Sequence, residues 1–335
     1  MRRPVVVVVF IVLAVLAAAP GAEARSWAQP QIRAAVQSGL MGPNVEHFRP
    51  KATLTQVELA RIVAGITRQA QEVQTPSAPV TMTGLNRALV RALGLAPVAR
   101  TFRTELGRAG LEPPQRGGWE TVARLLSLRF NHPSTRDDRE LRPQDPVNRA
   151  EAAYSVARVL QLSSWDLNRV ADLAGDFHLP ALGEWRTKVL KRAVRFVGYP
   201  YVWGGMSEYR QTLFGVTSRG GFDCSGFVWR VYKLQAFAGA PQLSGVLRGR
   251  TTYQMSGEVG LAKRVSWGNV KPADVLFFGS GRNSTPSQVT HTGIALGGGW
   301  MVHSSGQGTT ITPLSGWYQS GFAWARRPLR EAGLL

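Results

Sequence analysis

The spacing of apolar residues changes along the chain, and this change limits the fold more than any other feature. Up to residue 232, apolar side chains recur mostly three or four positions apart, as on one face of a helix. From residue 275 onward, short apolar runs are separated by glycines, as in strands joined by turns. These runs predict five strands, at 275–278, 292–296, 300–303, 309–312 and 322–325. Helices followed by strands predict an α+β fold, in which an antiparallel sheet packs on helices.

The first 24 residues have the layout of a secretory signal peptide. Arg2 and Arg3 precede an apolar run over 5–19, and small residues end at Ala24. The run is shorter than the ~20 residues that cross a bilayer comfortably, although a retained membrane anchor is the alternative interpretation. No second run of spanning length follows. We therefore expect residues 1–24 to be removed on export, which leaves a secreted protein without a transmembrane segment.

The charge balance of the chain is strongly positive. The 335 residues include 40 Lys+Arg against 21 Asp+Glu, a formal net charge of +19, and 44% are hydrophobic, which excludes a disordered chain. An excess of positive charge favours an anionic partner. Nucleic acid is disfavoured as that partner, because Lys and Arg form no clustered run and export removes the usual target. The single cysteine, Cys224, excludes an internal disulfide.

Residues 27–162 contain a repeated helical unit. Segments 48–60 and 141–153 align without a gap, and a weaker third copy begins at residue 82. In each copy a Thr or Asn precedes an amphipathic helix, which is the preferred placement of an N-cap. Glu58 and Glu151 stand three positions after that cap in the first and last copies, as in a capping box. The repetition predicts stacked helical units that share one core.

These units resemble S-layer homology repeats. The resemblance rests on Trp27, residues 39–42, residues 48–50, residues 55–60, Trp119 and residues 148–151. In that family, three such repeats anchor exported proteins to anionic cell-wall polymers, partly through the Arg of a Thr-Arg-Ala-Glu motif. Arg149 matches that Arg, whereas the other two copies have Gln56 and Gly84. A generic helical domain, in which Glu58 and Glu151 only cap helices, is the alternative interpretation.

A second change of pattern marks the start of another domain. Glycine, serine and proline interrupt residues 163–183, which predicts a connecting segment before a C-terminal domain over 184–330. That domain opens with an amphipathic helix over 185–197, which a glycine and a proline terminate. Another helix follows Asp223, so Cys224 is predicted in the first turn of that helix.

Cys224 is the candidate nucleophile of the chain. A helix N-terminus and a nearby imidazolium each lower the pKa of a thiol, and the thiolate is the strong nucleophile. His291 and His303 border two predicted strands that can form a hairpin, which would bring both rings to the thiol. The alternatives are core packing of the cysteine and structural histidines, while the close ligand spacings of a zinc site are missing. The remaining histidines are expected at the solvated surface: His47, His132 and His178.

Five blocks of the C-terminal domain resemble, in order, the NlpC family of papain-like cysteine peptidases. They are Pro-Tyr-Val-Trp-Gly-Gly at 200–205, Phe-Asp-Cys-Ser-Gly-Phe-Val at 222–228, and the segments 272–278, 291–296 and 301–306. One Asp-Cys-Ser-Gly could arise by chance, whereas an ordered set is a specific signature. The resemblance implies hydrolysis of amide bonds in peptidoglycan stem peptides, typically next to D-glutamate, without a metal or organic cofactor.

The resemblance also implies roles for matching positions. Cys224 is expected to be the nucleophile, His291 the base and His303 the orienting group. The positions expected to hold the oxyanion or to contact substrate are Tyr201, Asp223 and Ser225. Trp203 also matches, and we expect it to serve in packing.

Together with the predicted leader, the two resemblances predict a secreted, cell-wall-associated hydrolase that carries a wall-binding helical domain. One alternative is a wall-binding or scaffold protein with an inactive C-terminal domain. The presence of Cys224, His291 and His303 together argues against it, since a decayed site need not keep all three. Another alternative is a thiol acyltransferase or an amidase on a different substrate, because the nucleophile chemistry is shared.

Overall fold

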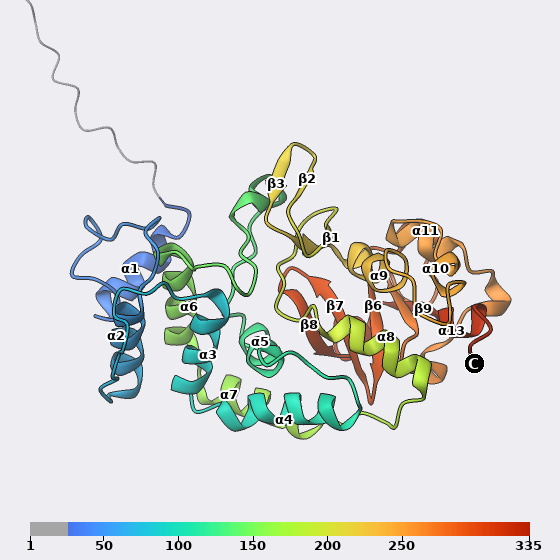
Figure 1. Cartoon of the computed structure of the whole chain (residues 1–335), viewed down its shortest axis with the longest axis horizontal. Helices are drawn as coiled ribbons and strands as arrows, with labels where there is room; N and C mark the ends of the chain where they lie inside the picture. Colours follow the sequence, from blue (N-terminus) through green and yellow to red (C-terminus); the bar gives the residue numbers. More distant parts are fainter. Residues whose placement is uncertain (1–25) are drawn as a thin grey trace, which may run out of the picture.

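The helical part of the chain precedes the sheet, as predicted. The computed structural model describes residues 26–335, so the predicted signal peptide at 1–24 lies outside the described residues. Figure 1 shows helices at one end of the molecule and the main sheet at the other. The first elements are α1 (Gln29–Gln37), α2 (Gln56–Thr67), α3 (Met82–Ala92), α4 (Ala96–Arg108), α5 (Gly117–Leu125), η1 (Ser134–Arg139), α6 (Arg149–Gln161) and α7 (Ser164–Gly175). Among residues 26–335, no helix is both long and apolar enough to cross a bilayer.

The three copies of the repeated unit close into a ring. Each copy begins with an N-cap whose side chain accepts a backbone N–H three residues later: Thr55 for α2, Thr81 for α3 and Asn148 for α6. The residue before each cap is buried, and 2.9 Å backbone hydrogen bonds run from Leu54 to Val147, from Val147 to Val80 and from Val80 to Leu54. The N-caps predicted at Thr55 and Asn148 and the shared core of the repeats are therefore confirmed. The third copy was aligned two residues too late, because two threonines stand close together there: its N-cap is Thr81, and Thr83 and Gly84 lie inside α3.

The last copy departs from the predicted capping box. Asn148 accepts the backbone N–H of Glu151, but the Glu151 carboxylate lies 2.6 Å from Nε2 of His132 and does not return to the cap. His132, which we expected at the surface, is only 3% exposed and packs edge-on against Trp27. Both predictions were wrong because a loop supplies a tertiary partner that local spacing does not reveal.

The prediction of a connecting segment at 163–183 is wrong for its first part, because helix α7 occupies it. Ser163 and Asp166 form a capping box at the start of this helix. Val170 and Ala174 are buried on one face of α7, and the helix packs against α4. Only the stretch after α7 is an irregular connection to the C-terminal domain.

A five-stranded antiparallel sheet of order β8-β7-β6-β5-β9 forms the base of the C-terminal domain. Each predicted strand is confirmed to within two residues at either end. The sheet strands are β5 (Val275–Phe278), β6 (His291–Gly297), β7 (Trp300–Ser305), β8 (Gly308–Pro313) and β9 (Phe322–Arg326). The other elements are α8 (Glu184–Val194), β1 (Met206–Ser207), β2 (Gln211–Leu213), β3 (Val216–Ser218), β4 (Gly221–Phe222), α9 (Cys224–Tyr232), α10 (Leu243–Val246), α11 (Thr252–Gly257), η2 (Leu261–Lys263), η3 (Trp267–Asn269), η4 (Pro286–Gln288), α12 (Trp317–Ser320) and α13 (Pro328–Glu331).

Alternate residues of the central strands face opposite sides of this sheet. Phe277 and Ile294 belong to the main apolar core, together with side chains of α8 and α9. Leu276 and Ala295 point the other way and belong to a smaller core. This alternation follows from the two-residue period of a strand. It places α9, which begins at Cys224, on the same face of the sheet as α8.

Arginines of the helical domain dock on the end of α8. Arg116 donates to the carbonyl oxygens of Arg195 at 2.6 Å and Val197 at 3.0 Å, and Arg124 donates to that of Gly198 at 2.6 Å. The Arg195 carbonyl belongs to the C-cap of α8, where backbone oxygens have no partner within the helix and carry partial negative charge, and those of Val197 and Gly198 lie in the turn that follows. Apolar side chains of both domains also belong to one continuous core. These contacts fix the orientation of the helical domain on the C-terminal domain.

Candidate active site

The candidate nucleophile lies where α9 begins, as predicted. Asp223 is the N-cap of this helix, and its carboxylate accepts the backbone N–H of Gly226. Helix α9 packs against β6 and β7, which carry the two candidate histidines. Cys224 is 8% exposed and belongs to neither apolar core, so its thiol is buried without being enclosed by apolar packing.

The pKa of the Cys224 thiol moves in the opposite direction from the one we expected. Burial, with a smaller contribution from the neighbouring Asp223 carboxylate, raises it to about 12. The backbone N–H groups of Thr292 and Ser225 lower it, as does Arg250, but by less than burial raises it. Desolvation of the charged form therefore outweighs the stabilisation that a helix N-terminus provides. In the absence of substrate, the thiol is protonated.

His291 and His303 lie on the neighbouring strands β6 and β7, and the predicted hairpin is confirmed. Nε2 of His291 is 2.8 Å from Nδ1 of His303, and Nε2 of His303 is 3.0 Å from the hydroxyl of Thr312. Both hydrogen bonds can run in either direction, because the threonine hydroxyl can donate or accept. The direction that suits a base is the one in which His291 donates to His303 and His303 donates to Thr312. This arrangement leaves an unprotonated Nδ1 on His291, which no hydrogen bond within residues 26–335 uses.

Burial also keeps both imidazole rings uncharged. It lowers the pKa of His291 to about 4. It lowers the pKa of His303 well below the ordinary value, and the proximity of His291 contributes to that shift. At neutral pH the site therefore pairs a neutral thiol with neutral imidazole rings. A neutral imidazole can accept a proton at the moment when the thiol loses one.

Two aromatic residues of α12 cover the histidine pair, and the sequence did not reveal them as part of the site. The ring centroid of Tyr318 lies 5.9 Å from that of His291 and 5.2 Å from that of His303. The half-exposed Trp317 ring lies 6.3 Å from His291. Burial raises the pKa of Tyr318 to about 12, with a smaller contribution from Cys224. The only sequence signal was the adjacent aromatic pair ahead of the last strand.

The segment that carries Tyr201 is paired with the residues before Cys224. A parallel bridge joins Tyr201 to Phe222, and the backbone N–H of Val202 donates to the Phe222 carbonyl at 3.2 Å. Burial raises the pKa of Tyr201, and the charges that Cys224 and Asp223 carry when ionised raise it further. Its phenol is therefore protonated and able to donate a hydrogen bond near the sulfur.

Asp223 and Ser225 are both bound to an arginine that the sequence analysis missed. Arg250 lies 3.1 Å from Oδ1 of Asp223, and it donates to Oγ of Ser225 at 2.7 Å and to the carbonyl of Gly204 at 2.9 Å. Arg250 precedes α11, far along the chain, so no local spacing linked it to the nucleophile. Asp223 is thus part of an ion pair at the site.

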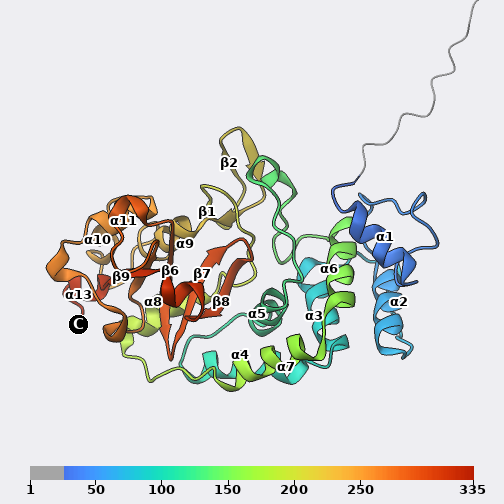
Figure 2. The ribbon, with the colours of Figure 1, turned by 180° about the vertical axis from the view of Figure 1, so that it is seen from behind.

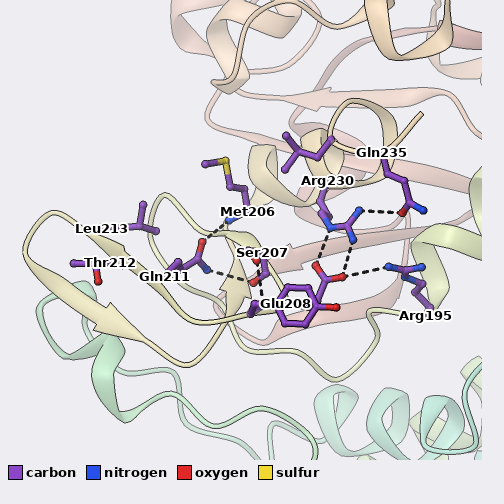
Figure 3. A pocket seen from close by; sticks show the side chains of 11 residues that line it. Arg195, Met206, Ser207, Glu208, Gln211, Thr212, Leu213, Arg230 and Gln235 are labelled. Carbon is purple, nitrogen blue, oxygen red and sulfur yellow. Dashed lines mark hydrogen bonds and ion pairs between the residues drawn. The ribbon is translucent and has the colours of Figure 1, made fainter. Parts of the chain in front are cut away.

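A surface cavity of about 660 Å³ lies beside this region but contains none of the candidate catalytic side chains. In Figure 3, the Glu208 carboxylate on its wall lies between Arg195 and Arg230, and the two ion pairs measure 3.3 Å and 2.6 Å. Both arginines are therefore already paired with the Glu208 carboxylate. Trp203 is 56% exposed and does not line the cavity, so our expectation that it serves in packing was wrong.

Comparisons with known proteins identify the class to which the C-terminal domain belongs. Residues 198–327 match the NlpC/P60 family, and this part of the chain is an NlpC/P60 domain. A gamma-D-glutamyl-L-lysine dipeptidyl-peptidase of Bacillus subtilis is 28% identical over 127 residues, which cover 38% of this chain and 34% of that protein. The bifunctional muramidase/DL-endopeptidase CwlT of the same species is 31% identical over 131 residues, or 39% of this chain and 32% of that protein.

The chain therefore spans about a third of the length of these relatives. Among solved structures, an NlpC/P60 family protein from Bacillus cereus is 24% identical, with a TM-score of 0.33, and the likeness covers 46% of this chain and 43% of that one.

Proposed function

We propose that this protein is a peptidoglycan hydrolase whose C-terminal domain cleaves amide bonds of stem peptides through the Cys224 thiol. His291 acts as the base and later as the acid, and His303 orients it. The observation that carries the proposal is the hydrogen-bonded chain from Thr312 through His303 to Nε2 of His291, which leaves Nδ1 of His291 without a hydrogen-bond partner among residues 26–335. The NlpC/P60 domain and the endopeptidase names of its relatives support the same chemistry.

The reaction starts from a neutral thiol and a neutral imidazole. The sulfur of Cys224 attacks the carbonyl carbon of the scissile amide while its proton passes to Nδ1 of His291. The carbon–nitrogen bond then breaks, and His291 gives that proton to the leaving amine, which leaves a thioester on Cys224. Water attacks the thioester with His291 as base, the carboxylic acid product departs, and the sulfur regains its proton.

The oxyanion of the tetrahedral intermediate requires hydrogen-bond donors. Tyr201 supplies a phenol that burial keeps protonated, and the backbone N–H of Cys224 supplies a second donor at the start of α9. The positive end of the helix dipole favours negative charge at the same place. Donors held in place before the reaction stabilise the intermediate without further reorganisation.

The bond that we expect to be cleaved lies next to D-glutamate. The relatives are named for γ-D-glutamyl and DL-peptide bonds, which supports a stem peptide as the substrate class. Defined muropeptides that contain D-glutamate followed by a diamino acid should yield two fragments separated at that bond, and the pair should contain one added water. Mass spectrometry of the products checks this. A product joined to an added amine would instead indicate an acyltransferase, and cleavage elsewhere would contradict the assigned bond.

We also propose that the protein is secreted and associated with the cell wall, and that the helical domain binds anionic wall polymer. A cavity of about 190 Å³ in the repeats is lined by Arg49 and Arg61, both of which are exposed. Arg149, the residue that matches the family motif, also lines it, but its guanidinium donates to the Phe48 carbonyl at 2.7 Å and pairs with Glu58. The exposed arginines, more than Arg149, are therefore the cationic groups that a polymer would meet.

Binding of this kind should weaken as salt rises. The formal charge of +19 and the exposed arginines act through solvent, where 1 M salt shortens the screening length to ~3 Å from ~10 Å at 0.1 M. We expect adsorption of the protein to purified cell wall to fall steeply between these two concentrations, as measured by sedimentation. Adsorption that is unchanged by salt would contradict an electrostatic interaction.

A further inference from the structure

The backbone of residues 200–205 lies directly against the nucleophile. Phe222 donates its N–H to the carbonyl of Pro200 at 3.2 Å, and Asp223 donates its N–H to the carbonyl of Gly205 at 3.0 Å. Arg250 also holds this segment through the carbonyl of Gly204. The segment carries Tyr201, so its position determines where the phenol stands relative to the sulfur.

One backbone group of this segment is satisfied by the other domain. The N–H of Trp203 donates to Oδ2 of Asp137 at 2.9 Å. Asp137 belongs to η1 of the helical domain, 66 positions earlier in the chain, and is only 5% exposed. The carboxyl side of this contact is shielded from solvent, whereas Trp203 itself is exposed, so the bond is part-buried.

The surroundings of η1 make this contact a fixed one. The element packs against β3, and both views show the green segment that contains η1 beside the β2–β3 hairpin (Figures 1 and 2). Arg116 and Arg124, which bind backbone carbonyls at the end of α8, connect the two domains at another point. Asp137 is therefore presented to the site by an element that packs directly on the C-terminal domain.

We propose that Asp137 is a positioning residue, supplied by the helical domain, which holds the 200–205 segment and with it the Tyr201 phenol against Cys224. The inference rests on the proposed hydrolase function. It assigns the helical domain a part in the reaction in addition to any role in wall binding. Loss of the Asp137 contact frees the N–H of Trp203 and lets the segment shift, and a displacement of about 1 Å at a reacting group can cost roughly a hundredfold in rate.

The charge state of Asp137 is consistent with this role. Burial raises its pKa to about 6, and the hydrogen bond from Trp203 opposes that increase. The carboxyl group is therefore mostly ionised at neutral pH and accepts a charge-assisted hydrogen bond. Asp137 also contributes to the raised pKa of Tyr201, which helps to keep the phenol protonated.

Three variants test the proposal. Asp137→Ala removes the acceptor, Asp137→Asn keeps an oxygen that can accept the Trp203 N–H, and Asp138→Ala is a matched control. The Asp138 side chain is 47% exposed and pairs with Arg136, 3.1 Å away, within the same element. We expect Asp137→Ala to lower kcat on a stem peptide roughly ten- to a hundredfold with little change in KM. Asp137→Asn should restore most of that loss, and Asp138→Ala should match the wild type.

Hydrogen exchange provides a readout that does not depend on catalysis. Peptides that cover residues 200–205 should exchange faster in Asp137→Ala than in the wild type, while Asp137→Asn and Asp138→Ala should leave them protected. Unchanged exchange and unchanged kcat in Asp137→Ala would overturn the positioning role. Equal losses in the Ala and Asn variants would also overturn it, since the hydrogen bond would not be the cause. If the segment exchanges faster in Asp137→Ala but the wild type cleaves no stem peptide, the proposed function would be overturned while the positioning contact would stand.

Discussion

Replacement of Cys224 by alanine is expected to reduce turnover of stem peptides roughly 10⁴-fold or more, because loss of a nucleophile removes the covalent route entirely. The chain has no other cysteine, so no second thiol can form the thioester. The side chain is small and lies outside both apolar cores, so the variant should fold normally. Release of fragments from defined muropeptides, followed by mass spectrometry, measures the loss.

Ser225→Ala provides a comparison at a neighbouring residue that we expect to contact substrate but not to react. It changes the next residue of α9 and removes one hydrogen bond from Arg250, but it leaves the thiol in place. Its thermal unfolding should resemble that of Cys224→Ala, while its turnover should remain far higher. Unchanged digestion by Cys224→Ala would exclude the thiol mechanism. Wild-type protein that binds cell wall but cleaves nothing would instead favour the scaffold alternative.

Replacement of His291 by alanine is expected to lower kcat/KM roughly 10²- to 10⁴-fold, the range typical of a lost general acid–base group. His303→Ala should cost less, because its ring acts through His291 and does not contact the reacting atoms. Steady-state kinetics of both variants on one stem peptide measures the difference. Equal activity of His291→Ala and wild type would contradict the assignment of the base.

His291 also determines how activity changes on the acid side of the pH profile. A base must be unprotonated to accept the thiol proton, and burial lowers the pKa of His291 to about 4. Activity of the wild type should therefore persist as pH falls through 6.5, where an ordinary histidine is half protonated, and should decline only near pH 4. An acid limb centred near 6.5 would show that the ring is solvated during turnover.

Much of the fold could be predicted from local sequence because local physics determines it. Glycines bound the strands of the sheet, and Thr55 and Asn148 mark helix starts that the structure confirms. Asp223 likewise predicted the start of α9, which places Cys224 at a helix N-terminus. The β6–β7 hairpin could be predicted because few residues separate the two strands in the sequence, so the pairing of His291 and His303 could be anticipated as well.

What the sequence did not reveal depends on contacts between distant segments. Arg250 and Asp137 reach the site from other elements, and no spacing near Cys224 points to them. The direction of the Cys224 pKa shift depends on how deeply the thiol is buried, which a helix start alone does not determine. Glu151 left its predicted capping box for the same reason, since His132 approaches from a separate loop.

The most direct test of the account uses a stem-peptide analogue with a fluoromethyl ketone in place of the scissile amide. Attack by a nucleophile on this group leaves a stable bond that peptide mapping by mass spectrometry can locate. The account predicts saturable modification of Cys224 alone, slowed by added stem peptide and reduced strongly in His291→Ala. Modification at another residue, or labelling of Cys224 at the same rate in His291→Ala and in the wild type, would contradict it.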